Sequence, residues 1–317
     1  MGKKFARFFR EMTWWGIEPG DKFFKIWGQG GNYVPGKQNL QELFTRYVLK
    51  REVVSAFRMG PEKMDRYLDI IRRKKYRVVE AYTSAGVALA KHVLENNIDI
   101  GIDIMVVSGE TLPDPYNDLI AKTFKCKVYN AYGSREFGRF AHPCELNRYL
   151  HYSMESFFLE FEKDNEPVMD EEGDILVTCF DNWAMPFIRY QIGDRAIPTD
   201  EMCECGRKLK LLKKVTGRIT EQIYSPSRRY ISIHYLTLLF EDASKYVKYF
   251  QAVLKKKDLL VINIVPTKNL NEEIAEELRS KVQEHAGNDL EVRFHYVEDI
   301  PLGKNNKRIL MKNEVIR

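Results

Sequence analysis

Between residues 77 and 131, short apolar runs alternate with segments that have helical spacing. Strands are expected at 77–80, 102–107 and 127–131, and helices at 85–96 and 114–124. Because each helix joins two successive strands, the connections are crossovers and the strands should be parallel. This alternation predicts an α/β fold that binds its ligands at the carboxyl ends of the strands.

The segments on either side of this alternation extend the expected architecture. Before it, we expect a helix at 3–15, strands at 23–27 and 53–57, and a helix at 61–74. After residue 152 the spacing becomes strand-rich, and 157–161 and 174–179 are expected to pair as strands. The pattern predicts a β-rich subdomain attached to a large α/β domain.

The pattern changes again after residue 217. The expected elements are strands at 248–254, 259–265 and 290–297 and a helix at 271–285. They predict a small C-terminal α+β domain. We therefore expect two domains, 1–216 and 217–317, which suits a chain of 317 residues at roughly 100–200 residues per domain.

Charge and hydropathy exclude several classes of protein. The chain carries 50 basic and 45 acidic residues, and the resulting net charge of +5 suits small anionic ligands but does not indicate nucleic-acid binding. The densest basic run, at 72–75, is expected to be the solvated end of a helix. No apolar stretch approaches the roughly 18 residues of a membrane helix, and the N-terminus lacks an apolar signal segment. We expect a cytoplasmic protein that does not associate with membranes.

Four potential metal ligands form two close pairs in the sequence. Five cysteines without a signal segment argue against a disulfide framework. His142 with Cys144, and Cys203 with Cys205, would give four nitrogen and sulfur ligands that suit a tetrahedral structural Zn²⁺ ion. The alternative is two unlinked pairs of residues that bind no metal.

Three short segments carry the strongest functional signal. They are YGSRE at 132–136, RYQIGD at 189–194 and TGR at 216–218. Each alone is weak, because Tyr-Gly and Gly-Asp pairs occur in many ordinary turns. Their order along one chain, followed by a basic motif near the C-terminus, is far more specific.

In that order the segments resemble the phenylacetate–CoA ligase family of adenylate-forming enzymes, including its relatives associated with coenzyme F390 synthesis and capsule biosynthesis. The segment SGETLPDPYNDLIAKTFKCKVYNAYGSREFG is similar to the family's adenine and magnesium region. PFIRYQIGDRA resembles its ribose-binding segment, and CECGR followed by VTGR resembles the approach to the domain hinge. The resemblance implies an adenylate-forming, acyl-CoA synthetase-like fold whose large α/β domain is truncated at its N-terminus.

The resemblance also implies roles in nucleotide binding. Gly109 and Glu110 would border the adenine, and Tyr132 would stack on or beside it, since an aromatic ring suits a purine face. Gly133 and Ser134 belong to the same nucleotide-binding segment. The alternative for Tyr132 is an ordinary aromatic residue of the core.

Further residues would handle the ribose, the phosphates and the metal. By resemblance, Asp194 accepts hydrogen bonds from both ribose hydroxyls, and Arg218 contacts ribose and phosphate. Glu136 falls at the position of a Mg²⁺ ligand, and Lys307 at that of the catalytic lysine, which offsets charge as the adenylate forms. The alternatives are a turn residue for Asp194, a helix first-turn acid for Glu136 and a surface lysine for Lys307.

The reaction implied by the resemblance is acid activation. A carboxylate attacks the α-phosphate of ATP to give an acyl-adenylate and pyrophosphate, and the acyl group then passes to CoA or to another thiol or amine. ATP, Mg²⁺ and CoA are the implied cofactors, and the acid is expected to be aromatic or apolar. The acyl pocket would be lined by Tyr82, Ser84, Ala85 and Gly86.

Departures from the family's pattern keep other functions open. No Ser/Thr/Gly-rich phosphate loop precedes the first expected helix, and Gln191 and Ile192 replace the family's usual arginine and threonine. The alternatives to an enzyme are a non-catalytic protein that binds a nucleotide or acyl-adenylate, and a scaffold in a biosynthetic complex. A homodimer is one expectation for its assembly.

Overall fold

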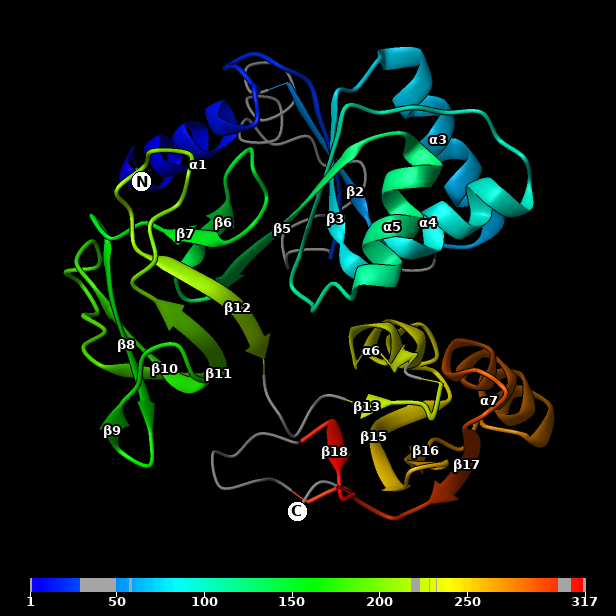
Figure 1. The fold of residues 1–317 in the computed structure, drawn as a ribbon. Coiled ribbons are helices and arrows are strands. Elements are labelled where there is room, and N and C mark those ends of the chain that lie inside the picture. Colours follow the sequence, from blue (N-terminus) through cyan, green and yellow to red (C-terminus); the bar gives the residue numbers. More distant parts are fainter. Residues whose placement is uncertain are drawn as a thin grey trace. The chain divides into compact units, whose positions relative to one another are not determined.

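The computed structural model describes residues 2–28, 50–56, 59–217, 223–227, 229–231, 233–301 and 309–315. The chain packs as two compact units, Met1–Gly217 and Arg218–Arg317 (Figure 1). Among the helices described, none is both long enough and apolar enough to cross a lipid bilayer. The division into two domains, 1–216 and 217–317, stays a prediction.

The first part of unit 1 is the α/β alternation. Its elements are α1 (Gly2–Trp14), β1 (Phe23–Trp27), β2 (Arg51–Ser55), α3 (Pro61–Lys74), β3 (Val78–Tyr82), α4 (Thr83–Glu95), β4 (Ile104–Ser108), α5 (Asp114–Phe124) and β5 (Lys127–Ser134). The strands pair in parallel in the order β2-β1-β3-β4-β5. The parallel sheet and its crossover helices confirm the α/β prediction, although several element bounds differ by a few residues.

Alternate residues of these strands point into two different cores. On one face, Val79 and Val107 pack with α3, α4 and α5, which lie together beside the sheet (Figure 1). On the other, Val106 and Tyr129 pack with the end of α1, where Trp15 stacks on Tyr129 with a centroid distance of 4.5 Å. Burial on both faces explains why the strands are almost continuously apolar.

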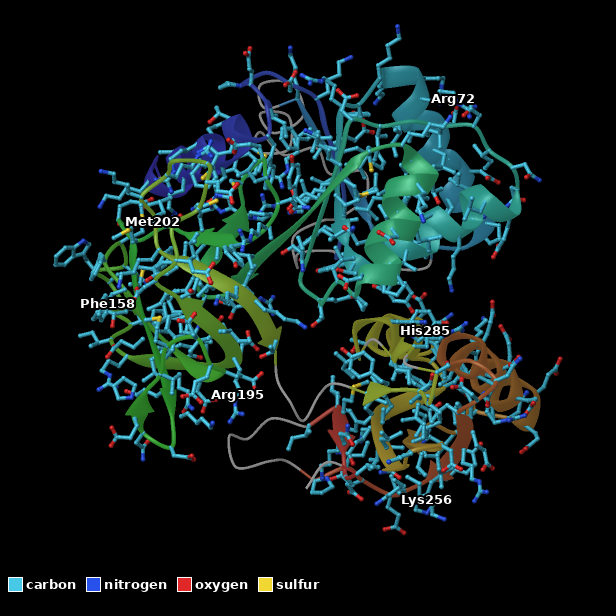
Figure 2. The ribbon with its side chains drawn as sticks, in the orientation of Figure 1. Arg72, Phe158, Arg195, Met202, Lys256 and His285 are labelled. Carbon is cyan, nitrogen blue, oxygen red and sulfur yellow. The ribbon has the colours of Figure 1, made fainter. Side chains whose placement is uncertain are left out.

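The basic run at 72–75 is an exposed helix end, as predicted. These residues complete and follow the last turn of α3, and all four are exposed. Lys75 ends the helix with a left-handed backbone conformation, at φ 53°. Arg72 extends from the surface of the helix, and its guanidinium donates to the carbonyl of Asp99 at 2.8 Å (Figure 2). Positive side chains at this end complement the helix dipole.

The second part of unit 1 continues the same sheet with antiparallel strands. They are β6 (Gly138–Pro143), β7 (Leu150–Tyr152), β8 (Phe157–Lys163), β9 (Glu166–Pro167), β10 (Gly173–Cys179), β11 (Tyr190–Thr199) and β12 (Leu211–Gly217). The order beyond β5 is β6-β7-β12-β11-β10-β8-β9. The predicted pairing of 157–161 with 174–179 is confirmed as β8 with β10. Phe137, Phe140 and Phe157 lie in the core of this part.

Unit 2 is a small α+β structure. It contains β13 (Ile223–Tyr224), β14 (Tyr230–Ile231), α6 (Ile233–Asp242), β15 (Val247–Lys256), β16 (Leu259–Pro266), α7 (Glu272–Ala286), β17 (Glu291–Tyr296) and β18 (Met311–Asn313). Four strands form a sheet in the order β17-β16-β15-β18. The side chain of Asn271 caps α7 by accepting from the amide of Ile274 at 2.9 Å.

A buried carboxylate joins four strands of unit 1. Glu80, on β3, is 3% exposed and forms ion pairs with Lys25 on β1 at 2.8 Å, Arg51 on β2 at 2.9 Å and Arg139 on β6 at 2.7 Å. Burial alone would raise the pKa of the Glu80 carboxyl, but Lys25, Arg139 and Arg51 together hold it well below its usual range. Glu80 therefore neutralises part of a cationic cluster inside the sheet.

Glu80→Gln should strongly destabilise unit 1. The amide keeps the size of the side chain but leaves Lys25, Arg51 and Arg139 without their buried counter-charge, and breaking a buried pair costs about 3–5 kcal/mol. Urea unfolding should report this loss. The matched control is Glu171→Gln, which breaks a half-exposed pair with Lys163 and should cost at most about 1 kcal/mol. Equal, small losses for the two variants would contradict the stabilising role of Glu80.

Candidate active site

The change from parallel to antiparallel pairing takes place within β5. Up to Ala131 the strand pairs with β4, and from Tyr132 onward it pairs with β6 through an irregular register. Gly133 has no room for a side chain, because a Cβ there would lie 2.3 Å from the carbonyl oxygen of Gly138 and 2.6 Å from the Cα of Arg139. This close approach of two backbones defines the direction in which the side chain of Tyr132 points from β5.

A bulge in β11 directs Asp194 toward Tyr132. Between the pairs formed by Gln191 and Arg195 with β10, three residues of β11 oppose one residue of β10. Gly193 adopts φ 87° within this bulge, a conformation that suits glycine. The Tyr132 hydroxyl donates to Asp194 Oδ2 at 2.9 Å, although 62 positions separate the two residues. The structure thus brings together the expected adenine and ribose residues, both half-buried.

The ring of Tyr132 also packs against a residue of β6, the strand that pairs with this part of β5. This ring meets that of Phe140 edge-on, with a centroid distance of 5.0 Å. Tyr132 can therefore be both a core aromatic residue and a residue that contacts a nucleotide. One part of the ring contacts the core, while its hydroxyl reaches the carboxylate of Asp194.

A second group of predicted residues gathers at the carboxyl ends of β3 and β4. The carboxylate of Glu110 accepts from the Ser84 amide at 2.9 Å and from the Ser84 hydroxyl at 2.7 Å. It thereby satisfies a donor in the first turn of α4, where a negative charge complements the helix dipole. Gly109, at φ 85°, lies against the ring of Tyr82, since a Cβ there would be 3.1 Å from Tyr82 Cδ1. Glu110 therefore has a structural task in this site.

Two of the expected pocket residues lie in the core instead. Ala85 is 3% exposed and packs with the helices that cover the parallel sheet. A Cβ on Gly86 would lie 3.5 Å from side-chain atoms of both Val107 and Ile120. Of the four residues assigned to the acyl pocket, Tyr82 and Ser84 are half-buried beside Glu110, whereas Ala85 and Gly86 belong to the contact between α4, the sheet and α5.

The remaining predicted residues are spread more widely. Glu136 lies exposed in the turn between β5 and β6. The hydroxyl of Ser134 accepts from the amide of Phe137 in this turn, at 3.3 Å. Arg218 and Lys307 lie outside the described residues.

Sequence reasoning missed an aromatic stack next to Tyr82. The rings of Trp27 and Tyr82 are stacked with a centroid distance of 4.0 Å, and Lys25 Nζ lies 3.9 Å from the centroid of the Trp27 ring. Burial, opposed by the attraction of Glu80, lowers the pKa of Lys25 to about 8. The signal was available, because Trp27 ends the strand expected at 23–27, at the edge of the sheet where parallel strands place ligand contacts.

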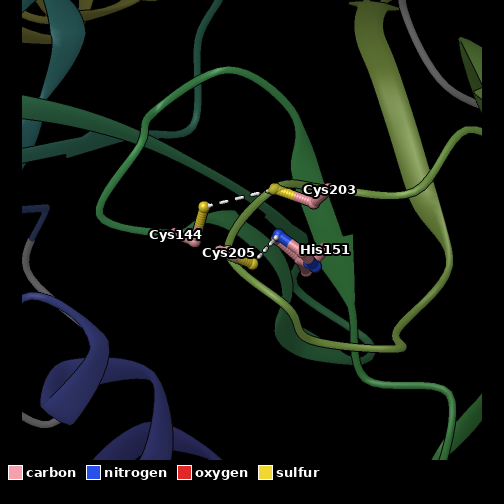
Figure 3. A group of neighbouring side chains, drawn as sticks. All are labelled: Cys144, His151, Cys203 and Cys205. Atoms are coloured by element: carbon pink, nitrogen blue, oxygen red, sulfur yellow. Dashed lines mark hydrogen bonds between the residues drawn. The ribbon is translucent and has the colours of Figure 1, made fainter.

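A separate cluster contains three cysteines and one histidine. Cys144 follows β6, His151 lies on β7, and Cys203 and Cys205 lie between β11 and β12 (Figure 3). Their potential ligand atoms all lie within 4.8 Å of one another. The sulfur atoms of Cys144 and Cys203 are 3.7 Å apart, and Cys205 Sγ is 3.5 Å from His151 Nε2.

The structure corrects the histidine of this cluster, because His151 and not His142 joins the cysteines. His142 and His151 are paired across β6 and β7, but His142 is covered by α1. Its ring packs on Trp14 with a centroid distance of 4.7 Å, and its Nδ1 atom faces the buried carboxylate of Glu11 at 3.3 Å. Burial, together with Arg139 and Arg10, holds the pKa of His142 well below its usual range. The spacing of residues along the sequence could not show that His151, on the neighbouring strand, lies beside the cysteines in place of His142.

Comparisons with known proteins support this architecture. Residues 223–314 match the family described as the CapK C-terminal domain. A 2-hydroxyisobutyryl-CoA ligase solved with 2-HIB-AMP and CoA has a TM-score of 0.61 and 18% identity, over 98% of this chain and 69% of that one. The amide bond synthetase McbA from Marinactinospora thermotolerans has a TM-score of 0.50 and 17% identity, over 96% of this chain and 63% of that one. The comparison with curated proteins gave no match.

These similarities establish the fold of the chain. Its mixed α/β sheet and small α+β unit form the adenylate-forming acyl-CoA synthetase fold. The predicted fold class is therefore confirmed. Identities of 17–18% show a shared fold, but they do not show that the site residues or their chemistry are shared.

Gly133→Ala should destabilise the protein by at least about 2 kcal/mol, because the new methyl group would overlap the backbone of β6. The matched control is Gly86→Ala, whose Cβ would make ordinary contacts and which should be neutral or stabilise α4 by up to about 1 kcal/mol. Urea unfolding would measure both changes. A tolerated Gly133→Ala would show that the two strands do not approach as closely as described.

Proposed function

We propose that this protein activates a carboxylic acid by forming an acyl-adenylate, and that the group around Tyr132 and Asp194 binds the nucleotide. The observation that carries the proposal is the 2.9 Å hydrogen bond between these residues, which two independent backbone irregularities create. A similar fold is found in a ligase that was solved with an acyl-adenylate.

The chemistry of the two side chains suits an adenosine. The face of Tyr132 offers an aromatic surface to a purine, while its hydroxyl holds the carboxylate of Asp194 in place. A carboxylate has about four acceptor sites, so Asp194 can accept from Tyr132 and from the two ribose hydroxyls. Bonds to a charged acceptor are stronger than those between neutral groups, which favours a ribonucleotide.

In this proposal, other residues act on the phosphates. Glu136, exposed at the turn after β5, offers a carboxylate to Mg²⁺, which would neutralise phosphate charge when bound. Two cationic side chains would also contribute: Arg218 would contact the ribose and the α-phosphate, and Lys307 would offset the negative charge of the reacting carboxylate. The acid's carboxylate oxygen attacks the α-phosphorus of ATP, pyrophosphate leaves, and the product is an acyl-adenylate.

The second half-reaction would transfer the acyl group. The thiolate of CoA attacks the acyl carbonyl carbon and AMP leaves, so the protein would be an acyl- or aryl-CoA ligase of the phenylacetate–CoA ligase type. The stacked rings of Trp27 and Tyr82 lie at the same edge of the sheet, with Lys25 Nζ over the Trp27 ring. We propose that they form one wall of the acid pocket, which favours an aromatic or apolar acid.

The direct test of nucleotide binding is a thermal-shift titration of this chain with AMP and with ATP plus Mg²⁺. AMP should raise the apparent stability, by about 2.7 kcal/mol at a concentration one hundred times its Kd. Asp194→Ala should abolish the shift, whereas Glu171→Gln, which changes a surface ion pair with Lys163, should keep it. Failure of AMP to shift the wild-type protein would contradict the proposal.

Pyrophosphate release then separates a ligase from a protein that only binds nucleotides. With ATP, Mg²⁺ and a panel of aromatic and apolar acids, a ligase should release pyrophosphate only when its acid is present. Glu136→Ala should reduce that release by roughly 10-fold or more without abolishing the AMP shift, because Glu136 acts on the metal and phosphates. An AMP shift without any acid-dependent release would favour the non-catalytic alternative.

A further inference from the structure

We infer that Cys144, His151, Cys203 and Cys205 form a structural zinc site that fixes one end of the antiparallel sheet (Figure 3). The inference concerns unit 1 alone and does not depend on the proposed acid activation. Three thiols and one imidazole are a ligand set that proteins use for closed tetrahedral zinc sites.

The distances within the cluster are those that a tetrahedral ion requires. With Zn–S bonds of 2.3 Å and Zn–N bonds of 2.0–2.1 Å, two sulfur ligands lie about 3.8 Å apart, and a sulfur and a nitrogen about 3.5 Å apart. The observed separations are 3.7 Å between Cys144 Sγ and Cys203 Sγ and 3.5 Å between Cys205 Sγ and His151 Nε2. Because every pair of ligand atoms is within 4.8 Å, small side-chain rotations would complete the tetrahedron.

No disulfide links these residues in the structure. Bonded sulfur atoms lie about 2.05 Å apart, whereas those of Cys144 and Cys203 are 3.7 Å apart, and all the cysteines are free. A third cysteine and a histidine at the same point would also be superfluous for a disulfide. Four ligands around one centre have a common explanation in a metal ion.

Backbone groups and one cation lie close to the sulfur atoms. The sulfur of Cys144 interacts with the backbone of Leu146 two positions later, and that of Cys205 with the backbone of Arg207, also two positions later. The Arg207 side chain also interacts with the Cys205 sulfur. Three thiolates and one Zn²⁺ carry a net charge of −1, which the Arg207 guanidinium, itself paired with Glu145 at 2.7 Å, would offset in part. Gly206, at φ 79°, permits the tight turn between Cys205 and Arg207.

The cluster is also closed to solvent on most sides. Cys144 and His151 are 0% exposed and Cys203 is 7% exposed. Trp14 covers the cluster, with its ring edge-on to His151 at a centroid distance of 5.5 Å and under the Arg207 guanidinium at 4.5 Å. A buried site with four protein ligands leaves no coordination position for a substrate, so the role is structural and not catalytic.

The position of the cluster indicates what the ion would stabilise. Residues 200–210, which join β11 to β12, form neither helix nor strand, yet two ligands lie there. Of the other two, Cys144 follows β6 and His151 lies on β7, 59 positions before Cys203 and 54 positions before Cys205. One ion would therefore hold two otherwise irregular connections together at the ends of four strands, including the strand that carries Asp194.

The first experiment is the metal content of the full-length chain, purified without added metal and passed through a chelating column. We expect about one zinc per chain, released by a strong chelator or by a thiol-modifying reagent. Co²⁺ exchanged for zinc should give visible bands of a tetrahedral ion and an intense thiolate-to-cobalt charge-transfer band. Removal of the zinc should lower the melting temperature by more than about 5 °C, because zinc binding contributes directly to folding.

Paired variants then assign the ligands. Cys205→Ser and His151→Gln should lose stoichiometric zinc, or bind it at least 10-fold more weakly. Cys179→Ser and His142→Gln are matched controls, at a thiol and an imidazole outside the cluster, and both should retain the ion. If a ligand variant does not fold, the zinc content and cobalt spectrum of the wild-type protein still decide the matter. Folded wild-type protein that binds neither metal would overturn the inference, as would zinc loss in His142→Gln but not in His151→Gln.

Discussion

The close approach of Gly133 to the backbone of β6 is the constraint on which unit 1 depends. At this point the sheet changes from parallel to antiparallel pairing, and a side chain at residue 133 would prevent the change. The same contact orients Tyr132, and the bulge at Gly193 brings Asp194 to meet it. The candidate nucleotide site is therefore a consequence of how two kinds of sheet are joined.

Two clusters of polar and sulfur-containing side chains lie among the strands on either side of this junction. Glu80 joins β1, β2, β3 and β6 through three buried ion pairs, which oppose the repulsion among Lys25, Arg51 and Arg139. The cysteine–histidine cluster lies at the far ends of β6, β7 and β12, and the proposed zinc ion would fix the connections there. The Glu80 cluster places charge where strands from distant parts of the chain meet, and the proposed zinc ion would do the same.

The sequence predicted the parallel sheet well and the details of the site less well. Apolar periodicity revealed β3, β4 and β5 because each is buried on both faces. The position of His151 beside the cysteines could not be predicted, because it depends on which residue of β7 lies opposite β6, and His142 was nearer to Cys144 in the sequence. The core positions of Ala85 and Gly86 escaped prediction for a related reason, since the rotation of α4 against the sheet decides which side of the helix faces a pocket. The buried position of Glu80 also escaped prediction, because the expected strand 77–80 ended at this residue, whereas β3 continues to Tyr82.

The most direct test of the account compares the binding of AMP and 2′-deoxy-AMP by calorimetry, in the wild-type protein and in Asp194→Asn. If Asp194 accepts from the ribose hydroxyls, the wild-type protein should bind AMP roughly 10-fold or more tightly than the deoxynucleotide, since a hydrogen bond to a charged group is worth about 1.5–3 kcal/mol. Asp194→Asn should bind AMP more weakly and lose most of this preference. Equal affinity of the wild-type protein for the two nucleotides, or an unchanged preference in Asp194→Asn, would contradict the assignment of the nucleotide site.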